Sequence, residues 1–353
     1  MSINEAQPRI IDDRRAATGG ASPSRFQPGT FALRDTWFPI FSSAMVHRRP
    51  VRRAIHGEPV VAYRKDHEVH VTDHMPGVPA QARRQSEFTA GSGRYPFVER
   101  FGYIWVWYGD PEHASEELVP NVPHMPLAGQ PRHFIVENVY DICYELAVEN
   151  LLDLTHADFL HTSLTGDSLA EDDQIEVFST SETITMVRTA MGRKIPPMQK
   201  LFAGSAKRQD VRITTMAHVR SGVCFTHGDF NPGMSIRQLA PNNPEMPNRT
   251  RQPLTFDAAH VPALVRHSFA AVAGHIVARQ DNWAFREQRA QYLEPRENND
   301  LSSRFDAAGL RYRKVFQRLV ERQAAGDLSY LSDGDPGRDV RSTMGLDKRI
   351  GSD

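Results

Sequence analysis

The segment at residues 149–161, ENLLDLTHADFLH, constrains the chain more than any other, because it sets imidazoles and carboxylates among leucines that a folded protein would bury. Apolar residues recur there at spacings of three and four, which predicts a helix packed against a core. Asp153 and His156 would share a face of that helix, since they lie three residues apart. Buried ionisable side chains need a partner or a metal ion. The segment therefore predicts a paired polar network or a metal site.

The two histidines, His156 and His161, are five residues apart. On an ideal helix this spacing separates them by roughly 140°, so a shared metal ion requires a wide turn or a helix end between them. A zincin-like pair has a spacing of four, so that site is disfavoured. Two imidazoles with one carboxylate are typical of non-haem Fe(II) oxygenases, whose iron keeps open positions for dioxygen. On spacing alone, histidines satisfied by ordinary hydrogen bonds remain the alternative.

The best candidate for the carboxylate ligand is Asp281, in the segment RQDNWAFREQR at residues 279–289. We expect Asp281 to open a helical segment. The alternative is an acidic residue near a helix N-terminus, where the helix dipole favours negative charge. Spacing alone favours this alternative.

Two blocks, NLLDLTHADFLH at 150–161 and QDNWAFREQRAQYL from Gln280, resemble the oxygenase components of Rieske non-haem iron ring-hydroxylating oxygenases and O- or N-demethylases. The sequence is most similar to the vanillate O-demethylase-like and purine N-demethylase-like branch, over roughly residues 31–325. The resemblance implies roles for five residues. His156, His161 and Asp281 would bind a mononuclear Fe(2+). Asp153 would be a bridging carboxylate that passes electrons to the site, and Asn150 would lie beside it.

The same resemblance implies an α+β fold with two domains. An N-terminal, degenerate Rieske-like antiparallel β domain would precede a catalytic domain of the helix-grip (START/Bet v1-like) class, with an antiparallel sheet and long C-terminal helices. We divide the chain into a flexible arm (residues 1–30), the Rieske-like domain (31–112), the iron-binding catalytic domain (113–330) and a polar, mobile tail (331–353).

The chain departs from the family where a Rieske cluster would bind. Such a cluster needs two thiolates on one iron and two imidazoles on the other, but both cysteines, Cys143 and Cys224, lie beyond the first third of the chain. Met75 and Gly77 stand where the family's first cluster loop has Cys and His, and the second loop is missing. One thioether cannot replace two thiolates. We therefore expect no [2Fe–2S] cluster in this chain.

Short β-rich runs bounded by turn residues predict antiparallel strands in both domains. The predicted strands of the N-terminal domain are Val51–Ile55, Pro59–Tyr63, Glu68–Thr72 and a closing segment from Tyr95 to Asp110. Those of the catalytic domain are Phe134–Val139, Gln174–Phe178, Thr183–Thr189, Val211–Val219 and Val223–Thr226. Proline-rich residues 241–253 predict a loop, and residues 261–293 and 301–323 predict helices.

Two further sets of side chains are candidates for binding. We expect the concave face of the catalytic sheet to form an apolar substrate cavity against the iron-binding helix. Its candidate lining residues, for which simple core packing is the alternative, are Phe202, Met216, Phe225, Phe230 and Met234. The second set consists of His67, His70 and His74. We expect these to be solvated strand or loop histidines, and a zinc site is the alternative.

Composition limits the possible partners. The 353 residues are 40% hydrophobic and carry a net charge of −1, so the chain can bury a substantial core and nucleic acid is not its expected partner. Two cysteines allow at most one disulfide. The first thirty residues lack the apolar region of a signal peptide, and no run reaches the length of a membrane span. We expect a soluble cytoplasmic protein that binds neither nucleic acid nor membrane.

These expectations combine into one hypothesis for function. The chain would be the iron-bearing subunit of a trimeric or hexameric hetero-oligomeric oxygenase, which hydroxylates or oxidatively demethylates a small aromatic or heteroaromatic substrate with O2. Electrons would come from a Rieske-cluster-containing oxygenase subunit or a ferredoxin, served by an NAD(P)H-dependent flavin or iron–sulfur reductase. The alternatives are a structural or regulatory subunit that stabilises a catalytic paralogue, and an iron enzyme whose substrate supplies the electrons.

Overall fold

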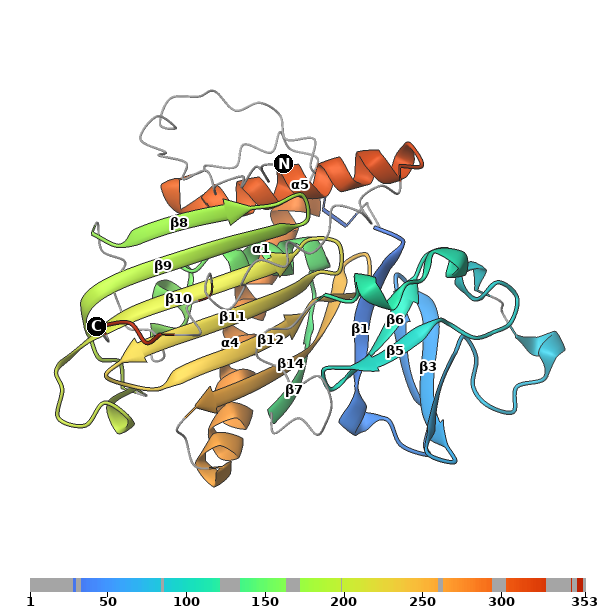
Figure 1. Ribbon diagram of the computed structural model, residues 1–353, viewed down its shortest axis with the longest axis horizontal. Coiled ribbons are helices and arrows are strands. Elements are labelled where there is room, and N and C mark those ends of the chain that lie inside the picture. Colours follow the sequence, from blue (N-terminus) through green and yellow to red (C-terminus); the bar gives the residue numbers. More distant parts are fainter. Residues whose placement is uncertain are drawn as a thin grey trace, which may run out of the picture.

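The computed structural model describes residues 28–29, 33–83, 86–120, 134–162, 172–197, 199–259, 263–293, 303–327, 344 and 348–351. Figure 1 shows a small β domain beside a large sheet that is accompanied by helices. The mixture of sheets and helices predicted from the sequence is confirmed, with β structure first and long helices at the C-terminal end. The predicted arm at residues 1–30 lies outside the described residues, except for 28–29.

The small domain consists of two three-stranded antiparallel sheets, in the orders β1–β6–β5 and β2–β3–β4. Its strands are β1 (Thr36–Ser42), β2 (Val51–Ile55), β3 (Glu58–Lys65), β4 (Glu68–Thr72), β5 (Phe97–Arg100) and β6 (Tyr103–Tyr108). Apolar side chains of both sheets, among them Phe38, Val60 and Val106, share one buried core. The three predicted strands between residues 51 and 72 are confirmed as β2, β3 and β4, and the predicted closing segment forms the hairpin of β5 and β6.

Tight turns fix the register of β2, β3 and β4. His56 and Gly57 join β2 to β3, Asp66 and His67 join β3 to β4, and all four residues have positive φ. Two consecutive residues with positive φ form the hairpin turn whose twist matches that of the flanking strands. The turns therefore hold β2–β4 as a meander without further connections.

The large sheet is antiparallel, in the order β13–β14–β12–β11–β10–β9–β8, with β7 also paired to β14. Its strands are β7 (Phe134–Tyr140), β8 (Gln174–Ser179), β9 (Thr183–Lys194), β10 (Arg208–His218), β11 (Val223–Asn231), β12 (Ser235–Pro241), β13 (Asn243–Met246) and β14 (Arg249–Ala259). The predicted strands of the catalytic domain are confirmed as β7 to β11. The prediction missed β12, β13 and β14.

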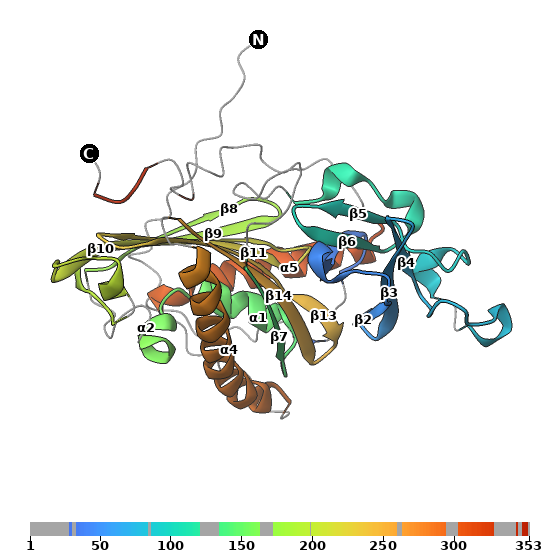
Figure 2. The same cartoon turned by 90° about the horizontal axis from the view of Figure 1, so that it is seen from below.

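Four described helices accompany this sheet: α1 (Tyr144–Leu152), α2 (Ala157–Leu160), α4 (Ala263–Leu293) and α5 (Ala307–Ala324). Figure 2 shows α1, α2 and α4 on the same side of the sheet. Alternate strand residues such as Ile184 and Ile213 pack with α1 and α5 in the largest core cluster. The two predicted helical regions correspond to α4 and α5. No helix among the described residues combines the length and the apolar character of a membrane span.

The predicted loop at residues 241–253 is wrong, because this segment contains β13 and half of β14. Pro253 lies opposite Glu137 of β7, whereas β12 pairs with β14 only from Thr255 onward and β13 pairs with it only as far as Arg251. Pro253 thus lies where one side of β14 changes partners. A strand tolerates proline where its pairing is interrupted, since proline has no ladder donor.

The face of the large sheet opposite α1 packs against the small domain. Trp37 and Trp107 of the small domain share a buried cluster with Phe225 and Leu239 of the large sheet. Trp37 and Trp107 themselves meet edge to face, with ring centroids 5.1 Å apart. The small domain therefore covers part of the face opposite the helices, and it also reaches α1, where Phe38 meets Tyr144 edge to face with ring centroids 6.3 Å apart.

The mobile tail predicted after residue 330 is wrong for the residues described there. Met344 is buried in the cluster that joins the sheet to the small domain. The Ile350 N–H donates to Asp229 at 2.6 Å, and the Arg349 guanidinium pairs with the same carboxylate. This segment is therefore packed on the sheet.

Glu145, in the first turn of α1, is a fully buried carboxylic acid. Its Oε1 accepts a hydrogen bond from the Gly29 N–H at 3.3 Å, and its Oε2 has no partner among the described residues. Burial raises the pKa of Glu145 to about 7, because a low-dielectric surrounding disfavours the charged form. The folded protein therefore holds this proton to a higher pH than the unfolded chain does.

The free energy of unfolding should fall as the pH rises from 5 to 8, and Glu145→Gln should remove much of this fall. The unfolded chain releases the proton first, so Glu145 costs stability above its unfolded pKa, up to about 3 kcal/mol beyond pH 7. Urea denaturation at pH 5 and pH 8 measures the effect, with Glu117→Gln, at an exposed position, as the control. An equal gain from Glu145→Gln at both pH values would contradict this account.

Candidate metal centre

A break in helical structure sets the positions of the two histidines. α1 ends at Leu152, and the backbone of Asp153 is no longer helical. The Asp153 Oδ1 accepts hydrogen bonds from the Thr155 N–H at 2.9 Å, the Thr155 hydroxyl at 2.6 Å and the His156 N–H at 3.3 Å. α2 then begins directly after His156 and ends directly before His161. The helix end that a metal ion shared by both histidines requires is therefore present. Asp153 and His156 do not share a helix face; they contact each other across the turn between α1 and α2.

Asp281 approaches the histidines from α4. It lies well inside this helix, so the prediction that Asp281 opens a helical segment is wrong. Residues 263–280 contain no proline, the residue that most strongly stops a helix. The helix-dipole alternative fails for the same reason, because that effect is confined to the first turn.

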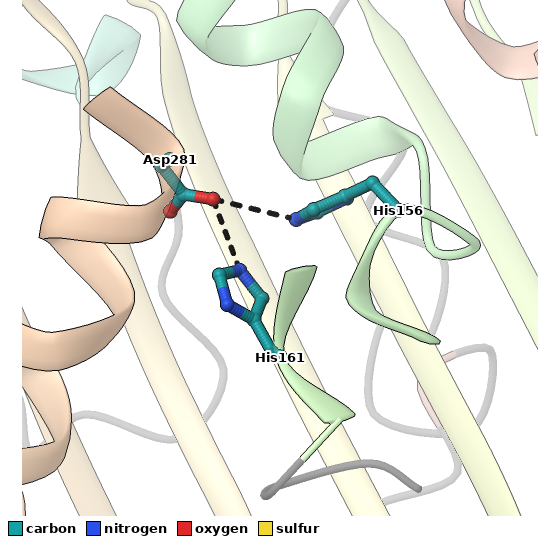
Figure 3. A group of neighbouring side chains, drawn as sticks. All are labelled: His156, His161 and Asp281. Atoms are coloured by element: carbon teal, nitrogen blue, oxygen red, sulfur yellow. Dashed lines mark hydrogen bonds and ion pairs between the residues drawn. The ribbon is translucent and has the colours of Figure 1, made fainter. Parts of the chain in front are cut away.

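The three side chains point toward one another (Figure 3). The Nε2 atoms of His161 and His156 lie 3.0 Å and 3.7 Å from the Oδ1 of Asp281. One possible ligand atom of each residue lies within 4.8 Å of the other two, and the described residues contain no other such group of His, Cys, Asp or Glu. The structure thus brings together all three predicted ligands.

Hydrogen bonds orient both imidazole rings. The His161 Nδ1 donates to the Oε1 of Gln280 at 2.8 Å, and the His156 Nδ1 donates to the backbone carbonyl of Asp153. With Nδ1 as the donor, each ring turns Nε2 toward Asp281, which is how outer partners hold metal-binding histidines. The amide nitrogen of Asn150 lies 3.5 Å from the His156 Nε2, so Asn150 borders the site.

The site is buried on one side and partly open on the other. The side chains of His161 and Asp281 are 6% and 8% exposed, whereas that of His156 is 17% exposed. Burial alone would lower the pKa of His161, but the hydrogen bond and charge of Asp281 raise it above its usual value. The metal-free protein therefore favours a proton on His161 beside Asp281.

The donor set fits a mononuclear iron. Two imidazole nitrogens and one carboxylate oxygen form the facial triad of non-haem Fe(II) sites, which leaves further coordination positions open. Structural zinc sites use four protein ligands instead. A cation here would also neutralise the buried carboxylate of Asp281. His156, His161 and Asp281 are the residues that would hold Fe(II).

Part of the predicted cavity lining lies on the other face of the sheet, so that part of the prediction is wrong. Of the five predicted residues, only Phe230 belongs to the described core cluster on the helix side. Met216 and Phe225 are register partners in β10 and β11, and both pack toward the small domain. Successive strand residues point to opposite faces, so the orientation of these side chains depends on a register that the sequence does not display.

The histidines of the small domain do not gather into a metal-binding group within the described chain. His70 stacks on Tyr63, with ring centroids 5.1 Å apart, and the His74 Nδ1 lies 2.6 Å from Asp73 Oδ1. The buried Asp73 carboxylate also accepts the Ser86 N–H at 3.2 Å and the Thr89 hydroxyl at 3.1 Å. A carboxylate network therefore holds the loop where the first cluster loop is expected.

Two outer contacts of the site were not predicted from the sequence. Gln280 directly precedes Asp281 and orients His161, and Arg188, a residue of β9, binds Asp158 between the two histidines. Neither has a spacing signal in the sequence, because each acts across a fold that brings distant segments together. The only sequence signal for either residue is that Gln280 is the neighbour of the predicted ligand Asp281. Arg188 has no such signal.

The fold and the site together define a class of protein, the oxygenase subunits of Rieske non-haem iron oxygenases. Residues 140–322 match the family model described as the vanillate O-demethylase oxygenase C-terminal domain. The chain therefore belongs to the vanillate O-demethylase oxygenase family, and the resemblance found in the sequence is confirmed.

Comparisons with individual proteins agree with this assignment. The vanillate O-demethylase oxygenase subunit of Pseudomonas sp. (strain ATCC 19151) is 24% identical over 261 residues, which cover 67% of this chain and 77% of that protein. The dicamba O-demethylase oxygenase component of Stenotrophomonas maltophilia is 36% identical over 72 residues, 19% of this chain and 20% of that protein. The crystal structure of dicamba monooxygenase bound to 3,6-dichlorosalicylic acid shares the fold, with a TM-score of 0.68 at 19% identity, over 83% of this chain and 99% of that one.

Metal binding at this site should release a proton and become tighter as the pH rises from 6 to 8. The reason is that a ligand imidazole must be deprotonated, whereas Asp281 raises the pKa of His161 in the metal-free protein. Calorimetric titration with Co(II) in two buffers of different ionisation enthalpy measures both effects. Asp281→Asn should weaken binding by at least about tenfold, whereas Glu287→Gln, at an exposed position of α4, should not. Equal Co(II) affinity in Asp281→Asn and the wild type would refute the site.

Proposed function

We propose that this protein is the iron-bearing subunit of a hetero-oligomeric Rieske-type oxygenase that hydroxylates or oxidatively demethylates an aromatic or heteroaromatic substrate with O2. The observation that carries the proposal is the convergence of His156, His161 and Asp281 on one point. Two relatives are named as a vanillate O-demethylase and a dicamba O-demethylase. These names favour an O-methyl group on an aromatic ring as the target.

Such a reaction needs electrons as well as oxygen. Hydroxylation of a C–H bond consumes O2, a pair of electrons and a pair of protons, and it releases water. When the hydroxylated carbon is an O- or N-linked methyl group, it leaves as formaldehyde. An electron source is therefore part of any complete account of this site.

We place that electron source on a partner protein. The chain has cysteines only at Cys143 and Cys224, and both are buried in the core of the catalytic domain rather than in the small domain. A Rieske cluster requires two thiolates on one iron. The partner would be a Rieske-cluster-containing subunit or a ferredoxin, reduced by an NAD(P)H-dependent flavin or iron–sulfur reductase, within a trimeric or hexameric assembly.

Asp153 is the residue that we assign to electron transfer from the partner. Its Oδ1 holds the turn before His156, while its Oδ2 accepts no hydrogen bond from the described residues. The Asp153 backbone carbonyl also accepts the His156 Nδ1–H. One residue would therefore contact a metal ligand through its backbone and could contact a donor group of the partner through its free carboxylate oxygen. This arrangement suits the bridging role that the family resemblance implies.

Bound Fe(II) would supply the position at which O2 is activated. The other parts of the reaction fall to the chain itself. Gln280 and the Asp153 carbonyl keep a proton on each Nδ1, so that both Nε2 atoms remain turned to the metal. The Asn150 amide, beside His156, is placed to hydrogen-bond a small molecule at the site. Burial of His161 and Asp281 excludes bulk water from the other side.

Reconstitution tests the proposal. The isolated chain, loaded with Fe(II) and given O2, NAD(P)H and a reductase that has no Rieske centre, should not release formaldehyde from vanillate or from other methoxy- and N-methyl-aromatic probes. Addition of a Rieske-cluster-containing oxygenase subunit should start the release. NAD(P)H-driven turnover without such a partner would contradict the partner requirement. Turnover without NAD(P)H would instead identify a substrate that supplies its own electrons.

His156→Ala in the reconstituted complex separates a catalytic from a structural subunit. Loss of this ligand should lower formaldehyde release by about 100-fold or more while size-exclusion chromatography still shows the complete assembly. His275→Ala, at an exposed position of α4, is the matched control and should retain activity. Unchanged activity of His156→Ala in an intact complex would favour the structural or regulatory role.

A further inference from the structure

A buried arginine holds the segment that carries both histidines. Arg188, on β9, is 5% exposed, and its Nη1 donates to the backbone carbonyl of Leu154 at 3.0 Å. Its Nη2 donates to the carboxylate of Asp158 at 2.5 Å. Leu154 precedes His156 by two residues, and Asp158 lies within α2 between the histidines. A single side chain of the sheet thus binds the segment on both sides of His156.

Asp173 fixes the guanidinium from the other side. Its Oδ2 accepts hydrogen bonds from the Arg188 Nε at 3.0 Å and from the Nη2 at 2.5 Å. Asp173 itself is buried and also pairs with Arg193. Arg188 is therefore not free to follow movements of α2, because its position is determined by β9 and by Asp173.

We propose that Arg188 is a positioning residue of the metal centre, which fixes the place where His156 and His161 meet Asp281. This inference rests on the metal site proposed above. α2 is a helix of only one turn, and a helix of that length has no stability of its own. Its position must come from contacts with the rest of the fold. Arg188 supplies these contacts from β9, which is paired on both sides, with β8 and β10.

The planar shape of the guanidinium is essential to this role. Arg188 reaches a carbonyl and two carboxylates at once, which its fork of five N–H donors allows. A lysine carries the same charge at a single point, so it can satisfy only part of this set. The charge alone would hold Asp158, but the orientation of the segment requires the fork.

Arg188 also decides which carboxylate faces the metal. Asp158 is buried, and its place in sequence between His156 and His161 makes it a competing oxygen ligand. Because the Asp158 Oδ2 is bound to Arg188, it is turned toward the sheet, and the metal-binding group contains Asp281 instead. Removal of Arg188 would free a buried carboxylate within the ligand segment itself.

The test compares Arg188→Met with Arg220→Met. Arg220 is an equally buried arginine, 4% exposed, and pairs with Glu182 just before β9 begins. Both changes leave a buried carboxylate without its arginine, so both should lower the midpoint of thermal unfolding. Only Arg188→Met should lower Co(II) affinity, by about 10- to 100-fold, and change the visible absorption spectrum of bound Co(II). A purely structural arginine would leave that spectrum as it is in the wild type.

Lysine variants keep the test decisive if Arg188→Met does not fold. Arg188→Lys retains the charge, so it should fold. It should bind Co(II) less tightly than the wild type by at least several-fold and alter the spectrum of bound Co(II). Arg220→Lys should also fold, but it should change neither the Co(II) affinity nor the spectrum. Wild-type affinity and spectrum in the folded Arg188 variants would overturn the positioning role while leaving the metal site intact. Failure of the wild type to bind Co(II) or Fe(II) would overturn the proposed site itself, and the role of Arg188 with it.

Discussion

The carboxylate of Asp153 fixes the turn that follows α1, and the metal-binding group depends on that turn. If α1 continued through residue 161, the two histidines would point roughly 140° apart and could not face one carboxylate. Asp153 instead accepts the N–H groups of Thr155 and His156, which turns the chain before α2 begins. The energy of such a cap is only about 1 kcal/mol, yet it decides whether two side chains converge. The remaining parts of the site then act on this turn: the Asp153 carbonyl orients His156, and Arg188 holds the turn on the sheet.

The metal site and the cluster around Trp37 and Trp107 lie on opposite faces of the large sheet. Helices α1 and α5 share the main core on one face, while Trp37 and Trp107 pack on the opposite face with Phe225 and Leu239. The small domain has a separate core between its own two sheets, and its loop after β4 is held by the carboxylate of Asp73. Among the described residues, neither the core of the small domain nor the cluster that joins it to the sheet contains a cysteine. A domain built in this way can therefore keep its fold and its place on the catalytic sheet whether or not an iron–sulfur cluster contributes to its stability.

The sequence displays short-range features well and long-range ones poorly. Strands β2 to β4 could be predicted because alternation and turn residues are local signals, and the turn residues have the positive φ that such hairpins need. No spacing rule connects His161 with Asp281, so the ligand set came from resemblance to a family. The continuity of α4 through Asp281 is a local feature of a segment without proline. The strands within the proline-rich segment and the faces of Met216 and Phe225, by contrast, depend on pairing or packing between distant segments. Arg188 is the clearest case, since a charged residue in a strand ordinarily predicts an exposed position, and here it is buried.

The geometry of the site is asymmetric, and this asymmetry bears on the proposed route of electrons. His161 and Asp281 are almost fully buried and form the close pair of the group, whereas His156 is farther from Asp281 and more exposed. His156 is also the ring that the Asp153 carbonyl binds. The exposed edge of the site therefore coincides with the residue that has a carboxylate oxygen unused by the described fold. A partner that docks at this edge would meet Asp153 and His156 first, while the buried pair would keep the metal away from water. Asn150 borders His156 as well, so the two residues that we propose to act beside the ligands, Asp153 and Asn150, both lie on the His156 side of the site.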